Sequence, residues 1–157
     1  MIKQLYWEDV QVGNEVTTLP KIASTQTLVK WAAASSDFNP LHYDAAFAEM
    51  NMIGKPIVHG GLKRAWLINL MTDWVGDNGT LKKLSCQYRG IDYPRGMKSL
   101  TEPMEGETWL CKGKVTKKYE KDGEHYVDCD IWVENAKGEK TTPGTAIATL
   151  PSRGKMH

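Results

Sequence analysis

Cysteine pairs, an excess of charge of one sign and long apolar runs are all missing from this chain of 157 residues. Its three cysteines, Cys86, Cys111 and Cys129, stand far apart and form no Cys-x-x-Cys pair, which argues against a zinc site and against a disulfide framework. The formal net charge of +1 gives no reason to expect binding to nucleic acid or to an anionic membrane surface. No run of about 18 apolar residues could span a bilayer, and the N-terminus has no apolar core of signal-peptide length. Together these absences predict a protein of the reducing cytoplasm that holds no metal.

What remains is a composition typical of one soluble globular domain. Hydrophobic residues make up 41% of the chain and charged residues 25%. A chain of this length can build a hydrophobic core without disulfides or metals. We therefore expect a single domain over residues 1–157, with a frayed tail from residue 151 onward.

The apolar pattern predicts helices in the first half of the chain and strands in the second. Residues 24–27 offer N-caps for a helix that should end near residue 35 or 36, and a short helix is predicted over residues 44–50. A long helix is predicted over residues 60–75, where the apolar arc is so broad that protein must surround most of the helix. The predicted strands cover residues 10–16, 81–93, 108–115, 125–133 and 145–150.

This order of elements predicts an α+β fold. Consecutive strands joined by hairpins form an antiparallel sheet, and such a sheet can curl around the long helix and bury it. The outer face and the edges of the sheet would still invite pairing, so we expect the protein to form a dimer.

Two short stretches carry candidate catalytic residues. In the first, Asp37 and His42 stand five positions apart around Asn39-Pro40. Because proline disfavours a helical conformation at the residue before it, this stretch is a turn that can aim both side chains at one point. In the second, an apolar strip leads to Gly60 at the start of the long helix, whose first backbone N–H groups have no partner within the helix. A carboxylate, an imidazole and free amides suit chemistry on a carbonyl compound.

Each residue of this set also has a simpler interpretation. An aspartate followed five residues later by a histidine is usually part of a surface turn. His59 is, by itself, more often a packed and hydrogen-bonded residue than a catalyst. Gly60 and Gly61 could simply allow close packing of a helix, and Asp44 is better explained as a helix cap. The order of these residues ahead of a buried helix favours the catalytic interpretation.

Residues 37–44, Asp-Phe-Asn-Pro-Leu-His-Tyr-Asp, followed by Pro-Ile-Val-His-Gly at 56–60, resemble the hydratase motif of MaoC-like proteins. These are the (R)-specific enoyl-CoA hydratases and 3-hydroxyacyl thioester dehydratases. The match extends through Thr-Asp-Trp-Val-Gly-Asp at 72–77, which resembles the catalytic-type subunit of the long-chain 3-hydroxyacyl-ACP dehydratases of type II fatty acid synthesis. The motif is specific because the Asp, Asn-Pro and His order occurs together with the downstream His-Gly.

The resemblance implies a hot-dog fold, in which a curved antiparallel sheet wraps a long central helix. It also implies reversible hydration of a trans-2-enoyl thioester of CoA or ACP without a cofactor. Asp37 and His42 would hold and activate one water, and the backbone N–H of Gly60 would bind the thioester oxygen. Asn39 would brace the catalytic loop and, with His59 and Gly61, contribute to substrate binding. The implied assembly is a homodimer, or a heterodimer or heterotetramer with another hot-dog chain.

Several positions depart from the family pattern. Lys63 and Arg64 occupy the start of the helix, where many relatives are apolar, and residues 88–93, Tyr-Arg-Gly-Ile-Asp-Tyr, are more polar than in relatives. The usual Pro-Gly-Asp-Thr segment appears only as Glu-Gly-Glu-Thr at 105–108, after an insertion. The acyl group and the carrier therefore stay open. A hot-dog thioesterase, or a non-catalytic thioester-binding subunit of a heteromer, are the alternative functions.

Overall fold

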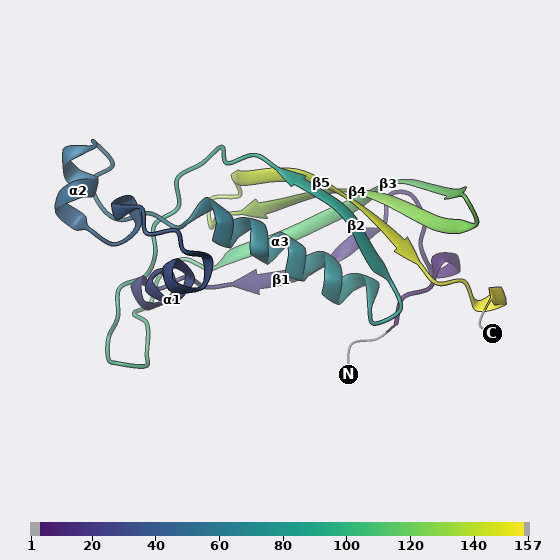
Figure 1. Ribbon diagram of the computed structural model, residues 1–157, viewed down its shortest axis with the longest axis horizontal. Coiled ribbons are helices and arrows are strands. Elements are labelled where there is room, and N and C mark those ends of the chain that lie inside the picture. Colours follow the sequence, from purple (N-terminus) through teal and green to yellow (C-terminus); the bar gives the residue numbers. More distant parts are fainter. Residues whose placement is uncertain (1–3, 156–157) are drawn as a thin grey trace.

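The computed structural model describes residues 4–155 and has an α+β architecture (Figure 1). Its antiparallel sheet has five strands in the order β1-β3-β4-β5-β2. The strands are β1 (Glu15–Lys21), β2 (Thr80–Cys86), β3 (Trp109–Lys121), β4 (Glu124–Glu134) and β5 (Lys140–Leu150). The helices are α1 (Thr25–Ser35), α2 (Ala45–Met50) and α3 (Gly60–Val75), with 3-10 turns η1 (Trp7–Asp9), η2 (Pro40–His42) and η3 (Arg153–Lys155).

The long helix α3 lies across one face of the sheet and contacts all five strands (Figure 1). Its buried side chains include Trp66, Leu67, Leu70 and Met71. They pack against the inward side chains of the strands in one hydrophobic cluster, and burying each large apolar side chain contributes about 1.5–3 kcal/mol. The predicted helix over residues 60–75 is confirmed, and so is the hot-dog fold that the resemblance implies.

Helix α1 delivers the chain to the first stretch of candidate residues. Its N-cap, Ser24, lies in the predicted 24–27 stretch and forms a reciprocal capping box with Thr27. At its carboxyl end Ser36 has a left-handed backbone conformation with φ of 59°, which ends the helix. The Asn39 side chain then accepts the backbone N–H two residues further on and starts η2.

The predicted strand over residues 10–16 is wrong in its bounds, because only its last two residues belong to β1. The chain turns at Gly13, which has a φ of 93°, and the Asn14 N–H donates to the Gln11 carbonyl. The strand therefore begins only after this turn.

The predicted strand over residues 81–93 is also too long, because β2 ends at Cys86. Beyond that point the backbone N–H groups of Arg89 and Gly90 both donate to the Thr141 carbonyl. Two donors on one acceptor break the regular ladder, and the chain bends toward α3. This bend forms one wall of the site described below.

The end of the described chain is held against η1. The Trp7 N–H donates to the Pro151 carbonyl over 2.9 Å, and the Arg153 guanidinium pairs with the Asp9 carboxylate over 2.6 Å. Residues 156 and 157 of the predicted frayed tail lie outside the described residues.

Each cysteine lies in a strand, as predicted: Cys86 in β2, Cys111 in β3 and Cys129 in β4. All three thiols are free. Burial raises the pKa of Cys111 and of Cys129 to about 12, so both behave as small apolar core residues. Within residues 4–155, none of the helices is long and apolar enough to cross a membrane.

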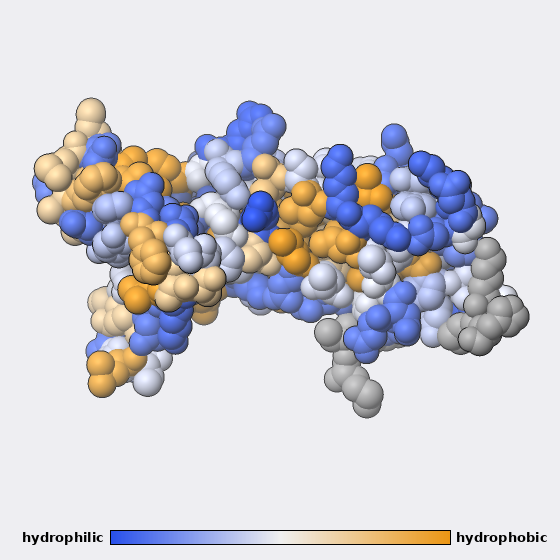
Figure 2. Space-filling view, viewed as in Figure 1, coloured by the Kyte–Doolittle hydropathy of each residue, from blue (hydrophilic) through white to orange (hydrophobic). Residues whose placement is uncertain are grey.

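The surface of the molecule offers features that suit assembly. Strands β1 and β2 are the two edges of the sheet, each paired on one side. Apolar surface gathers along the middle of the face where α3 and β2 lie (Figure 2), and Ile68 of α3 is 39% exposed. An open edge beside an apolar helix face is a surface that a second chain can cover.

Candidate active site

The structure brings together three titratable side chains that span 22 positions of the sequence. Asp37, His42 and His59 each offer one oxygen or ring nitrogen, and these atoms all lie within 4.8 Å of one another. The Asp37 side chain is exposed, His42 is half-buried and His59 is fully buried. Asp37 and His42 thus face each other as predicted.

The hydrogen bond of His42 defines which of its ring nitrogens is free. His42 Nδ1 lies 2.8 Å from the Ile57 carbonyl oxygen. Since a carbonyl only accepts, Nδ1 carries the hydrogen and donates it. The neutral ring therefore leaves Nε2 with a lone pair, which is the form a general base needs.

His59 lies beneath this pair and supports it. Its ring stacks on the His42 ring with 3.7 Å between centroids and 20° between planes. Its Nε2 donates to the Asp37 carbonyl over 3.2 Å. His59 therefore holds the backbone of Asp37 and the ring of His42 in place. Its Nδ1 is buried and has no hydrogen-bond partner among residues 4–155.

Burial and the neighbouring His42 ring lower the pKa of His59 below its ordinary value of 6.5. The unfolded chain therefore binds a proton at this position more readily than the folded one. We expect the free energy of unfolding to fall as the pH drops below about 6.5 toward the lowered pKa, and His59→Gln to weaken this dependence. Urea unfolding of both proteins between pH 8 and pH 5 checks this. Equal slopes against pH for the two proteins would contradict it.

Gly60 starts α3 next to a small cavity of about 220 Å³. Within the described chain, no side chain caps this end of the helix, and the first amides of a helix have no partner inside it. The residues that line the cavity are His42, Ile57, Val58, Gly60, Lys63, Tyr88, Arg89, Gly90 and Ile91. Asp37 is not among them, but its carboxylate lies within 4.8 Å of a His42 ring nitrogen.

A side chain at position 60 would collide with the Tyr88 ring, because a Cβ there would lie 2.9 Å from it. The motif implies hydration of an enoyl thioester, and we expect Gly60→Ala to lower the kcat/KM of that reaction by about 10- to 100-fold. The displaced Tyr88 ring or helix backbone would misplace the reacting groups. Tyr88 is 53% exposed, so Tyr88→Ala in the Gly60→Ala background should restore part of the activity. Steady-state kinetics of the two single variants and the double variant check this. Additive losses would show that Tyr88 is not the cause.

The other predicted residues stand around this centre. Asn39 is exposed, and its side chain caps η2 while its N–H lies 3.4 Å from the Asp37 carboxylate. Gly61 packs against Trp31 and does not line the cavity. Asp44 caps α2 by accepting the Phe47 N–H, as its simpler interpretation predicts. Substrate contacts of Asn39, His59 and Gly61 stay predictions.

The three clustered side chains do not suit a metal ion. Zinc binds a histidine nitrogen in the plane of the ring at about 2.0–2.1 Å. The rings of His42 and His59 are nearly parallel and 3.7 Å apart, so their in-plane lone pairs do not converge on one ion.

One wall of the site depends on residues whose pairing the sequence did not predict. Lys63 Nζ donates to the Asp92 carboxylate over 2.7 Å, and both side chains are buried. The Trp109 indole N–H donates to the other Asp92 oxygen over 2.9 Å. Lys63 and the polar run 88–93 are visible in the sequence as departures from the family pattern. The sequence does not show that these two segments contact each other.

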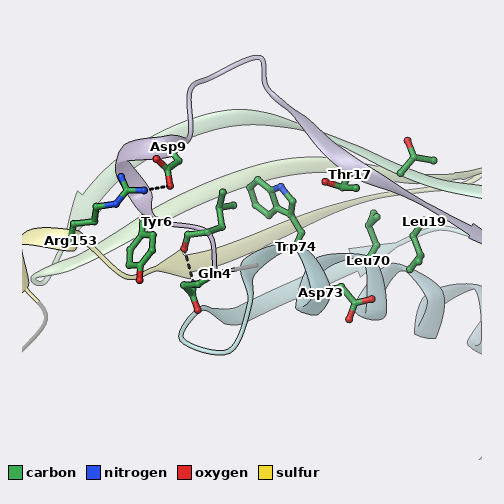
Figure 3. A pocket seen from close by; sticks show the side chains of 11 residues that line it. Gln4, Tyr6, Asp9, Thr17, Leu19, Leu70, Asp73, Trp74 and Arg153 are labelled. Atoms are coloured by element: carbon green, nitrogen blue, oxygen red, sulfur yellow. Dashed lines mark hydrogen bonds and ion pairs between the residues drawn. The ribbon is translucent and has the colours of Figure 1, made fainter. Parts of the chain in front are cut away.

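A larger cavity, of about 740 Å³, lies at the other end of α3 (Figure 3). Asp73 borders it and lies thirteen residues beyond Gly60, or about 20 Å along the helix. The two carboxylates that line this cavity already have partners, since Asp9 pairs with Arg153 and Asp73 accepts a hydrogen bond from Asn69. No histidine lines this cavity, so it lacks the candidate acid–base residues.

Residues 8–95 match the model of the MaoC like domain, which is more than half of the chain. The chain belongs to this MaoC-like family. It is 31% identical over 74 residues to the (R)-specific enoyl-CoA hydratase of Aeromonas caviae, an alignment that spans 47% of this chain and 54%, about half, of that relative.

Solved structures of MaoC-like proteins share the fold. The (R)-hydratase of A. caviae, described as involved in PHA biosynthesis, has a TM-score of 0.75 and 23% identity over 92% of this chain and 99% of that one. The R-hydratase PhaJ1 of Pseudomonas aeruginosa has a TM-score of 0.79 and 21% identity over 96% and 88%. The ChsH1-ChsH2 complex of Mycobacterium tuberculosis has a TM-score of 0.72 and 19% identity over 90% and 98%.

Proposed function

We propose that this protein is a hydro-lyase that hydrates a trans-2-enoyl thioester of CoA or ACP and, in reverse, dehydrates the (3R)-hydroxyacyl thioester. The observation that carries this proposal is that the Asp37 carboxylate lies close to His42, whose Nε2 is free, and that His42 and Gly60 line one small cavity. Membership of the MaoC-like family supports the reaction class.

The reaction requires an acid–base pair. The oxygen of water bonds to the β-carbon, and the electron pair of the double bond moves onto the thioester oxygen as an enolate. Asp37 and His42 hold the water between them, take one proton from it and return one to the α-carbon. Such general acid–base catalysis typically contributes about 10²- to 10⁴-fold.

The enolate oxygen requires a donor. The Gly60 N–H stands at the positive end of the α3 dipole and lines the cavity. Losing one such donor typically costs about 10²- to 10³-fold in kcat. The same groups serve both directions, because the enolate is common to hydration and dehydration.

The purified chain, mixed with crotonyl-CoA and longer trans-2-enoyl-CoA thioesters, should decrease the absorbance of the enoyl-thioester band. Free thiol is measured in the same samples with a chromogenic reagent. Loss of the band without thiol release supports the proposal. Thiol release at the same rate indicates a thioesterase, and no reaction with any enoyl thioester, from CoA or from ACP, contradicts a hydratase.

We propose in addition that the functional assembly is a dimer of hot-dog chains, formed across the apolar face of α3 and the β2 edge. The structure of the ChsH1-ChsH2 complex indicates that a partner chain of a different sequence is compatible with the fold. Light scattering of the purified chain tests for the homodimer. Activity that appears only after co-expression with a second hot-dog chain would indicate the heteromer.

A further inference from the structure

One partner of a buried ion pair, Lys63, lines the cavity. The side chains of Lys63 and Asp92 are 3% and 1% exposed, and they are 2.7 Å apart. The Asp92 carboxylate is held at its second oxygen by the Trp109 indole, and its backbone carbonyl accepts the Val58 N–H. Three hydrogen bonds therefore hold Asp92 in place, and its carboxylate in turn holds the Lys63 ammonium.

Lys63 lies near the Gly60 end of α3. It lies three residues after Gly60 in α3, so both residues are on the same face of the helix. Side chains of a helix lean toward its amino end, which directs Lys63 toward the turn that starts at Gly60. Both residues line the same cavity with His42.

The Lys63 ammonium retains hydrogen-bonding capacity. Among residues 4–155, its Nζ donates to the Gly90 carbonyl over 3.0 Å and to Asp92 over 2.7 Å. An ammonium group has three N–H donors, so one remains for a ligand. An apolar group placed against it would leave a buried charged donor without an acceptor, which is costly.

The cavity of about 220 Å³ is half open to solvent, so it confines only the part of a substrate that lies beside His42, Gly60 and Lys63.

From this geometry we infer that Lys63 is a specificity-determining residue, whose remaining N–H donates to an oxygen atom on the acyl group. The preferred substrates are then enoyl thioesters that carry a hydroxyl or carboxylate beyond the double bond. This inference rests on the proposed hydratase function and names its substrate class.

The test compares substrates of equal chain length. Crotonyl-CoA is measured beside its 4-hydroxy derivative and beside the mono-CoA thioester of trans-2-butenedioic acid, in which a carboxylate replaces the methyl group. The variant is Lys63→Met with Asp92→Asn. It removes both buried charges together, which is often neutral for stability, and it keeps an oxygen that accepts from Trp109. The matched control is Lys137→Met, the same change at an exposed turn.

The measured quantity is the kcat/KM of each oxygen-bearing thioester divided by that of crotonyl-CoA. Because intrinsic reactivity is the same for every protein, it cancels when this ratio is compared between wild type and variant. We expect the ratio for the hydroxyl or the carboxylate substrate to fall by about 10-fold or more in the double variant and to stay at the wild-type value in Lys137→Met.

Unchanged ratios in a folded double variant would overturn the inference while leaving the hydratase function in place. If wild type hydrates no thioester, the proposed function fails as well. A measurement independent of variant folding uses the saturated thioesters as inhibitors of wild type. The four-carbon thioesters ending in a hydroxyl or carboxylate should inhibit about 10-fold more strongly than butyryl-CoA, and equal inhibition would contradict the inference.

Discussion

The Asp37→Asn variant is expected to hydrate enoyl thioesters with a kcat about 10²- to 10⁴-fold below that of wild type. An amide keeps the size of the side chain and an oxygen that can accept the Asn39 N–H, but it cannot take a proton from water. The expected loss therefore reports chemistry and not a change in the loop. The measurement is steady-state kinetics with crotonyl-CoA, with circular dichroism and the midpoint of thermal unfolding recorded on the same protein.

The matched control for this variant is Asp44→Asn. Asp44 is also exposed, and it caps α2 by accepting the Phe47 N–H. Asparagine caps a helix as well as aspartate does, so both activity and stability should stay at wild-type values. If Asp37→Asn and Asp44→Asn had the same kcat, the acid–base assignment would be wrong.

A variant at His42 extends the test. His42→Gln removes the free Nε2 and should lower kcat by a similar factor, while glutamine can still donate to the Ile57 carbonyl. If the two residues act on one water, the double variant should lose little more than the worse single variant, since groups that act as a unit are strongly non-additive. Multiplied losses would instead mean that the two residues act in separate steps.

The central helix and the closeness of Asp37 and His42 could be predicted from the sequence because their signals are local. The apolar arc of residues 60–75 is contained within one helix. Asn39-Pro40 defines the turn that orients Asp37 and His42. Gly13 shows the limit of this reasoning. The alternating pattern before it indicates a strand, but its positive φ turns the chain and moves β1 toward the C-terminus.

The parts that could not be predicted depend on contacts between distant segments. The stacking of His59 on His42 joins residues 17 positions apart, and nothing in either local pattern requires it. Lys63 and Asp92 are 29 positions apart. A lysine at a helix start and an aspartate in a polar run each suggest a solvated charge, and only the folded chain places them together out of water.

The Asp92→Ala variant is expected to cause the largest loss of stability, about 3–5 kcal/mol. It leaves the Lys63 ammonium buried with one carbonyl partner, and it leaves the Trp109 indole N–H without its acceptor. For a domain of this size such a loss lowers the midpoint of thermal unfolding by about 10 °C or more. Urea unfolding with the linear extrapolation gives the free energy directly.

The comparison that isolates the cause is the rescue of this variant. Asp130→Ala removes an exposed carboxylate from β4 and should change the free energy of unfolding by no more than about 0.5 kcal/mol. Lys63→Met combined with Asp92→Ala should recover most of the stability that Asp92→Ala loses, because the penalty comes from a buried charge without a counter-ion and not from the missing carboxyl volume. If the double variant is as unstable as Asp92→Ala, the loss comes from the cavity and from the freed Trp109 N–H, and the ion pair does not stabilise the wall of the site.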